Sequence, residues 1–281
     1  MARWFHNGSE VDTVSINDRG LQYADGLFET IALRGGQPRL WELHSERMQT
    51  SSRRLGIDLP ADTTILSGLT AAVDATENSD QDALLKIIIT RGEGDRGYAP
   101  PPGSNPTILF GVFNSTEHPA ERYQKGVAVR FCNSRLSSQP QTAGIKLLSR
   151  LDQVLARAEW QDPDIAEGLM LDQNGCVVCG TMSNLFVVRD GTLITPEITH
   201  CGVSGVMRQH ILALAEKNDV PIAVDRISPE RVQDADEIFL CNSQFGIWPV
   251  SRCGNKRITD WPLTTDLMAL LRASGVVEGP E

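Results

Sequence analysis

A polar segment near the middle of the chain, residues 114–124, most constrains what this sequence can fold into. The segment contains Pro119 and shows neither helical nor strand periodicity, so it is predicted to be a linker. It divides the 281 residues into an N-terminal part, 1–113, and a C-terminal part, 125–281. Each part has the size of an ordinary domain, so a two-domain protein is predicted.

Both parts mix strand and helix patterns. An Asn7-Gly8 pair predicts a β-hairpin at the start of the chain. Trp41–Leu55 is predicted to be a helix that ends at Gly56, and apolar runs at Ala83–Thr90 and 107–113 predict buried strands. In the C-terminal part, short strands separated by turns surround predicted helices at 150–160 and 206–217. An α+β enzyme with its site between the two parts is expected.

Charge and cysteine content narrow the class of protein. The net charge of −10 disfavours nucleic-acid binding, which needs a basic surface. No segment is long and apolar enough to span a bilayer, and residues 1–10 lack the apolar core of a secretory signal. Six scattered cysteines are typical of a reduced, cytoplasmic protein. Cys176 and Cys179 form a C-x-x-C without a second such pair, so no metal site is predicted.

Two of the five lysines stand among aliphatic residues, whereas the other three stand beside turn residues. Lys86 lies in Leu-Leu-Lys-Ile-Ile-Ile and Lys146 in Gly-Ile-Lys-Leu-Leu. Desolvation lowers the pKa of a lysine toward the neutral amine that a Schiff base requires. A lysine on the outer face of a half-buried strand gives the same pattern, and the residues alone favour that interpretation.

A glycine-containing segment, 202–208, precedes the predicted helix at 206–217. Glycines and a helix start together suit a bound phosphate, although an ordinary turn before a helix is the simpler interpretation. Arg47, Arg91 and Arg96 could also bind phosphate or carboxylate groups, but surface ion pairs better explain any one of them.

Taken in order, these features resemble the fold-type IV pyridoxal phosphate enzymes, the class IV aminotransferase family. Its members include D-amino acid and branched-chain aminotransferases, and within it the chain is most similar to the aminodeoxychorismate lyases. The resemblance runs along nearly all of the chain. It is carried by Asp-Arg-Gly-Leu-Gln-Tyr-Ala-Asp-Gly-Leu-Phe-Glu-Thr at 18–30, Gly-Ile-Lys-Leu-Leu-Ser-Arg-Leu at 144–151, and the segments 44–48, 91–98, 183–186, 202–208 and 241–243.

The resemblance implies a role for each matching residue. Lys146 is then the Schiff-base lysine and proton carrier, and Arg47 binds the phosphate of pyridoxal 5'-phosphate. The remaining residues implied at the phosphate are Val206, Met207 and Ser243, and those implied near the substrate are Thr30, Arg96, Tyr98 and Asn242.

One residue departs from the family pattern. A glutamate five residues before the asparagine of Ser-Asn-Leu-Phe pairs with the pyridine nitrogen in the family, and here Cys179 stands there. A neutral thiol is a poor counter-ion, so the cofactor is expected to be a weaker electron sink. Elimination that forms an aromatic product depends less on that sink than amino transfer does, which favours a lyase.

The sequence therefore predicts a two-domain α+β fold with pyridoxal phosphate between the domains and the Schiff-base lysine in the C-terminal one. The expected reaction converts 4-amino-4-deoxychorismate to 4-aminobenzoate and pyruvate, in folate biosynthesis. The expected protein is a cytoplasmic homodimer. A D-amino acid or branched-chain aminotransferase is the first alternative, and a non-catalytic relative that lost the nitrogen's carboxylate at Cys179 is the second.

Overall fold

The computed structural model describes residues 2–75, 82–103, 105–115 and 117–279, which form two compact units. The first unit comprises Met1–Glu117 with Ile145–Ser149, and the second comprises His118–Gly144 with Arg150–Glu281. The change between units at residue 117 falls inside the segment predicted as a linker. The short segment that carries Lys146 packs with the first unit, whereas the sequence assigned it to the C-terminal part. Long-range packing determines which unit this segment belongs to, and no local sequence pattern indicates it.

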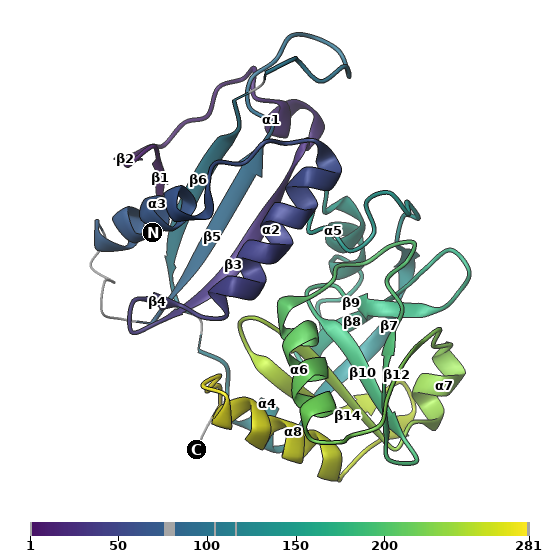
Figure 1. Ribbon diagram of the computed structural model, residues 1–281. Coiled ribbons are helices and arrows are strands. Elements are labelled where there is room, and N and C mark those ends of the chain that lie inside the picture. Colours follow the sequence, from purple (N-terminus) through teal and green to yellow (C-terminus); the bar gives the residue numbers. More distant parts are fainter. Residues whose placement is uncertain (1, 76–81, 104, 116, 280–281) are drawn as a thin grey trace. The chain divides into compact units, whose positions relative to one another are not determined.

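The first unit is an antiparallel sheet with helices packed on it (Figure 1). The strand order is β2-β1-β6-β5-β3-β4. The strands are β1 (Arg3–His6), β2 (Ser9–Glu10), β3 (Gly26–Arg34), β4 (Gln37–Pro38), β5 (Ala83–Thr90) and β6 (Thr107–Asn114). The helices are α1 (Arg19–Tyr23), α2 (Trp41–Leu55) and α3 (Asp62–Asp74).

Local sequence signals explain several of these elements. The predicted hairpin is confirmed, because β1 and β2 pair across Asn7 and Gly8, whose φ angles of 51° and 77° suit a tight hairpin turn. Helix α2 ends at Gly56 in the left-handed conformation, as predicted. Strand β5 differs from the prediction of full burial, since Leu84, Lys86 and Ile88 are only half-buried. Because β5 carries apolar side chains on both faces, its sequence does not indicate which face packs against the core.

The second unit is built on a mixed sheet that closes on itself. The strand order is β12-β11-β10-β13-β14-β7-β8-β9, with β15 on β14, and β9 also pairs with β10. The strands from β10 through β9 therefore form a closed ring. The strands are β7 (Val127–Arg135), β8 (Ile165–Leu171), β9 (Val177–Gly180), β10 (Asn184–Arg189), β11 (Thr192–Pro196), β12 (Ile222–Asp225), β13 (Glu237–Asn242), β14 (Gly246–Cys253) and β15 (Lys256–Arg257).

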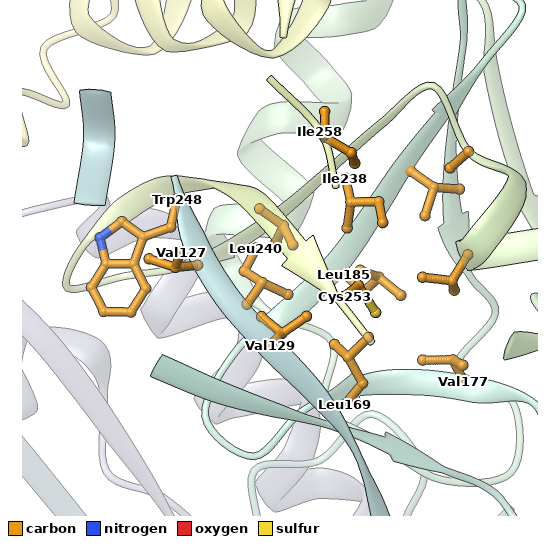
Figure 2. Close-up of a cluster of buried hydrophobic side chains, with 14 of the residues drawn as sticks. Val127, Val129, Leu169, Val177, Leu185, Ile238, Leu240, Trp248, Cys253 and Ile258 are labelled. Atoms are coloured by element: carbon orange, nitrogen blue, oxygen red, sulfur yellow. The ribbon is translucent and has the colours of Figure 1, made fainter. Parts of the chain in front are cut away.

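Apolar side chains from the strands of this ring converge in one core (Figure 2). Val129, Leu169, Leu185 and Leu240 are all buried there. The helices of this unit are α4 (Glu121–Gln124), α5 (Leu151–Arg157), α6 (Val206–Lys217), α7 (Pro229–Asp234) and α8 (Pro262–Ala273). Helix α6 has the predicted bounds, whereas α4 lies within the segment predicted as a linker.

Two further observations concern the described residues. None of the helices described there is long and apolar enough to cross a membrane. Within the same ranges, no group of three or more His, Cys, Asp and Glu side chains is arranged to hold a metal ion.

Candidate functional site

Lys146 lies in a short extended segment beside β3 in the first unit. The Phe28 N–H donates to the Lys146 carbonyl at 2.9 Å, and the Leu148 N–H donates to the Gly26 carbonyl at 3.1 Å. The Lys146 Nζ lies 4.2 Å from the centroid of the Phe28 ring. The aromatic face attracts the ammonium form and holds the amine on one side of β3.

Lys86, the other lysine among aliphatic residues, meets the same ring. It lies on β5 opposite Thr30 of β3, and its Nζ is 5.1 Å from the Phe28 centroid. The structure therefore brings together the two lysines that the sequence singled out separately. Thr30, predicted near the substrate, is half-buried two residues after Phe28 and faces the same side of the strand.

Arg47, the predicted phosphate ligand, forms a buried ionic cluster with two residues that the sequence did not identify. Its Nε donates to Glu29 Oε1 at 2.7 Å, and its Nη2 donates to Glu29 Oε2. His44, one turn earlier on α2, donates from Nδ1 to Glu29 Oε2 at 2.7 Å. Glu29 is 1% exposed, and His44 is fully buried.

Electrostatics within this cluster fix its charge states. Burial alone raises the pKa of Glu29, but Arg47 and His44 outweigh it and lower that pKa to about 2. Burial lowers the pKa of His44, and this outweighs the opposite effect of Glu29. At neutral pH the carboxylate is ionised and the imidazole is neutral. The Nε2 of His44 is buried without a hydrogen-bond partner among the described residues.

The loop that carries Arg96 and Tyr98 is anchored to α1. Buried Arg19 donates from Nη1 to the Gly97 carbonyl at 2.9 Å and from Nη2 to the Tyr98 carbonyl at 3.2 Å. The Tyr98 side chain is 86% exposed and contacts the ring of Tyr23 edge-on. Arg19 is a third residue that the sequence did not identify.

Arg91, considered as a possible anion ligand, has a structural role. Its Nε and Nη2 donate to the Asp25 carboxylate, and its Nη1 donates to the Gly56 carbonyl at 2.6 Å. Burial raises the pKa of Asp25, but ion pairing with Arg91 and Arg19 outweighs this and lowers it. Arg91 therefore caps the C-terminus of α2.

In the second unit, the segment 202–205 leads into α6 and leaves backbone N–H groups at the helix start. The helix N-cap is Gly205, which has no side chain with which to cap this end. The Gly144 N–H donates to the Gly202 carbonyl at 3.1 Å, and the Ser204 N–H donates to the Gly144 carbonyl at 3.0 Å. Uncapped N–H groups and the helix dipole favour an anion beside Val206 and Met207.

Asn184 explains why Gly205 must be a glycine. The Asn184 Nδ2 donates to the Val203 carbonyl at 3.0 Å. A Cβ on Gly205 would lie 1.9 Å from Asn184 Oδ1, so the hydrogen-bonded Asn184 side chain would have to move. The Ser-Asn-Leu-Phe motif thus supports the loop that precedes α6.

Cys179 lies where β9 closes onto β10, paired with Asn184. It is 6% exposed and packs with apolar residues and with Cys132 and Cys201. Burial, together with Cys201 and Glu167, raises the pKa of Cys179 to about 12, so the thiol is neutral at physiological pH. The position that carries a carboxylate in the expected family therefore offers no negative charge here.

Glu167 is a buried carboxylate that the sequence did not identify. It accepts hydrogen bonds from the Thr181 N–H at 3.1 Å, the Thr181 hydroxyl at 2.5 Å, the Met182 N–H at 3.0 Å and the Ser183 hydroxyl at 2.9 Å. These bonds hold the turn between β9 and β10. Glu167 thereby fixes the backbone that follows Cys179.

Asn242 is the last residue of β13, and Ser243 begins the turn from β13 to β14. The Asn242 Oδ1 accepts from the Gln244 N–H at 2.8 Å and the Phe245 N–H at 2.9 Å, and its Nδ2 donates to the Met182 carbonyl at 3.2 Å. Asn242 thus ties this turn to the one held by Glu167. Ser243 is half-buried beside it.

Comparison with known proteins assigns the family. Residues 26–253 match the model of the amino-transferase class IV family. An aminodeoxychorismate lyase of Vibrio harveyi is 37% identical over 245 residues, covering 87% of this chain and 89% of the relative. A putative branched-chain-amino-acid aminotransferase of Methanocaldococcus jannaschii is 30% identical, covering 87% and 85%.

A solved structure extends this agreement to the fold. The 4-amino-4-deoxychorismate lyase of Pseudomonas aeruginosa is 45% identical and has a TM-score of 0.91, with 98% of this chain and 100% of that chain covered. The predicted α+β fold of fold-type IV enzymes is confirmed by this similarity and by the closed mixed sheet. The chain belongs to the class IV aminotransferase family.

Proposed function

We propose that this chain is a pyridoxal phosphate-dependent lyase that converts 4-amino-4-deoxychorismate to 4-aminobenzoate and pyruvate. The observation that carries the proposal is the 45% identity, over essentially the whole chain, with an enzyme of that name from Pseudomonas aeruginosa. The Vibrio harveyi relative supports the same activity. The aminotransferase relative is less similar, so amino transfer is the less favoured activity.

The residues present fit pyridoxal phosphate, with one departure. Lys146 offers an amine held on an aromatic face, and Arg47 offers a guanidinium whose orientation is fixed. The uncapped start of α6 and Ser243 suit the phosphate. The departure is Cys179, whose neutral thiol supplies no counter-ion to the pyridine nitrogen.

When bound, the cofactor withdraws electrons from the carbon that carries the substrate amine. Lys146 would take the proton from that ring carbon as general base. The ring electrons then expel the enolpyruvyl oxygen, so a C–O bond breaks and the ring becomes aromatic. Lys146 or a water would return a proton to the methylene carbon of the departing enolate, which becomes pyruvate. Because aromatisation drives this step, it tolerates the missing carboxylate at Cys179 better than amino transfer does.

Thr30, Arg96, Tyr98 and Asn242 are the proposed substrate residues. Arg96 suits a carboxylate, because a guanidinium forms paired hydrogen bonds with one. Thr30 is supported by its place on the same strand face as Phe28, whose ring the Lys146 amine contacts. The anchoring of the 97–98 backbone by Arg19 supports a defined position for the loop.

Assembly and location complete the proposal. Exposed apolar side chains occur on each unit: Ile16, Leu21 and Tyr98 on the first, and Leu151, Val154 and Leu155 on the second. Burying them against a second copy supports a homodimer, which light scattering coupled to size exclusion would measure. Each of the six cysteines, all within the described residues, is a free thiol, which supports a cytoplasmic protein.

The deciding experiment incubates the purified protein and pyridoxal phosphate with 4-amino-4-deoxychorismate. Release of 4-aminobenzoate and pyruvate in equal amounts is expected. Amino transfer from a D-amino acid or branched-chain amino acid to a keto acid, without pyruvate release, would instead favour the aminotransferase. A protein that stays colourless with added cofactor and performs neither reaction would favour a non-catalytic relative.

A further inference from the structure

Two successive residues of β3 contact the two cationic side chains that the proposed function assigns to the cofactor. The ring of Phe28 contacts the Lys146 amine, and the Phe28 N–H bonds to the Lys146 backbone. The next residue, Glu29, points to the opposite face of the strand, where it pairs with Arg47 of α2. Strand β3 therefore helps to position both the Lys146 amine and the Arg47 guanidinium.

The Glu29 carboxylate restrains the guanidinium at two nitrogens. Arg47 Nε and Nη2 both donate to it, which forms a planar fork and prevents rotation of the guanidinium. The charge-assisted hydrogen bond from His44 to Oε2 restrains the carboxylate from a second direction. The orientation of Arg47 is thus set before any ligand binds.

A purely stabilising ion pair between β3 and α2 is the simpler explanation of this cluster. Buried ion pairs contribute little net stability, however, because desolvation offsets their attraction. The buried Nε2 of His44, which has no partner among the described residues, adds a further cost. A role in orienting the guanidinium would explain why a cluster that adds little stability is present. Hydrogen-bond partners of metal-binding side chains orient those side chains in the same way.

We propose that Glu29, supported by His44, is a positioning residue that aims Arg47 at the phosphate group of the cofactor. This inference rests on the proposed function, in which Arg47 binds that phosphate. Because Glu29 is only 1% exposed, it would act on the cofactor through Arg47.

The test compares two ligands that differ only in the phosphate. Apoprotein is titrated with pyridoxal phosphate and with pyridoxal, and the ratio of their dissociation constants measures the phosphate contribution without any turnover. Glu29→Gln should reduce this ratio about tenfold, the order of one charge-assisted hydrogen bond lost, while pyridoxal binding stays unchanged. Arg47→Ala should reduce it at least as much. Adding Glu29→Gln to Arg47→Ala should cause no further reduction, because the two act in series.

Two further variants keep the test decisive. Glu29→Asp retains the charge but shortens the side chain by one methylene, so it should also reduce the ratio. This variant replaces Glu29→Gln in the test if Glu29→Gln does not fold. Glu237→Gln is the matched control, because Glu237 is a buried carboxylate that accepts from the Leu263 and Thr264 N–H groups at the start of α8. It should lower stability and leave the ratio unchanged.

The contrary outcomes separate this inference from the proposed function. If Arg47→Ala reduces the ratio but both Glu29 variants leave it unchanged, the positioning role is wrong and the phosphate role of Arg47 stands. If Arg47→Ala leaves the ratio unchanged, both are wrong. If Glu237→Gln lowered the ratio of dissociation constants as much as Glu29→Gln does, the effect of Glu29 would be general destabilisation, and the inference would be overturned.

Discussion

Replacing Cys179 by glutamate introduces the carboxylate that the resemblance to fold-type IV enzymes implies at this position, and it should change which reaction the protein favours. The side chain is 6% exposed and lies among Cys132, Met170 and Cys201. A larger residue overfills this cluster at a cost of about 1–3 kcal/mol. Cys179→Gln has the same shape as Cys179→Glu and no charge. Comparison of the two variants therefore isolates the electrostatic effect from the packing effect.

The size of that effect follows from the burial of the site. Two opposite charges about 4 Å apart attract by roughly 4 kcal/mol at the effective dielectric constant typical of proteins. Desolvation of the new carboxylate, together with the nearby Glu167, offsets much of this. We expect a net of about 1.4 kcal/mol, so pyridoxal phosphate should bind the glutamate variant about tenfold more tightly than the glutamine variant.

The assay measures two activities of each variant in parallel. Pyruvate release from 4-amino-4-deoxychorismate reports elimination, and keto acid formation from a D-amino acid reports amino transfer. Amino transfer needs the stronger electron sink and elimination is driven by aromatisation, so the ratio of transfer to elimination should rise in Cys179→Glu. An equal ratio in both variants, at saturating cofactor, would refute the reasoning about Cys179 and leave the role of Lys146 untouched.

Three other perturbations test separate parts of the site. Lys146→Ala should abolish the visible absorbance of the bound cofactor and essentially all turnover, whereas loss of that absorbance in Lys86→Ala instead would reverse the assignment of the two lysines. Burial lowers the pKa of His44 below its ordinary 6.5. Below pH 6.5 the imidazole therefore binds a proton in the unfolded chain but not in the folded protein, so the free energy of unfolding decreases as the pH is lowered. In His44→Gln, urea unfolding should show a smaller loss of stability between pH 6.5 and 5, and an unchanged loss would show that other groups cause it. Gly205→Ala should cost about 2 kcal/mol or more by thermal unfolding, because its Cβ would overlap Asn184 Oδ1. In an Asn184→Ala background, which removes the crowding oxygen, Gly205→Ala should cost clearly less, and an unchanged cost there would contradict the close-contact argument.

The sequence by itself determined the features that depend on neighbouring residues. The Asn7-Gly8 hairpin, the end of α2 at Gly56 and the bounds of α6 all follow from local turn and capping preferences. Motifs spread along the chain also indicated the family, because each combines unusual residue types at fixed spacing.

Only the tertiary structure decided which distant residues meet. Glu29, His44 and Arg47 become one buried cluster because β3 and α2 pack together, and 18 residues separate the carboxylate from the guanidinium along the chain. Lys86 and Lys146 reach one aromatic ring from segments far apart in sequence.

The same holds for Glu167, whose sequence neighbours Ala166 and Gly168 carry no sign of the turn that it holds. The closing of β9 onto β10 at Cys179 is likewise a long-range event. Local preferences act over a few residues, whereas partners in a buried cluster are chosen by packing and by the need to satisfy every buried charge.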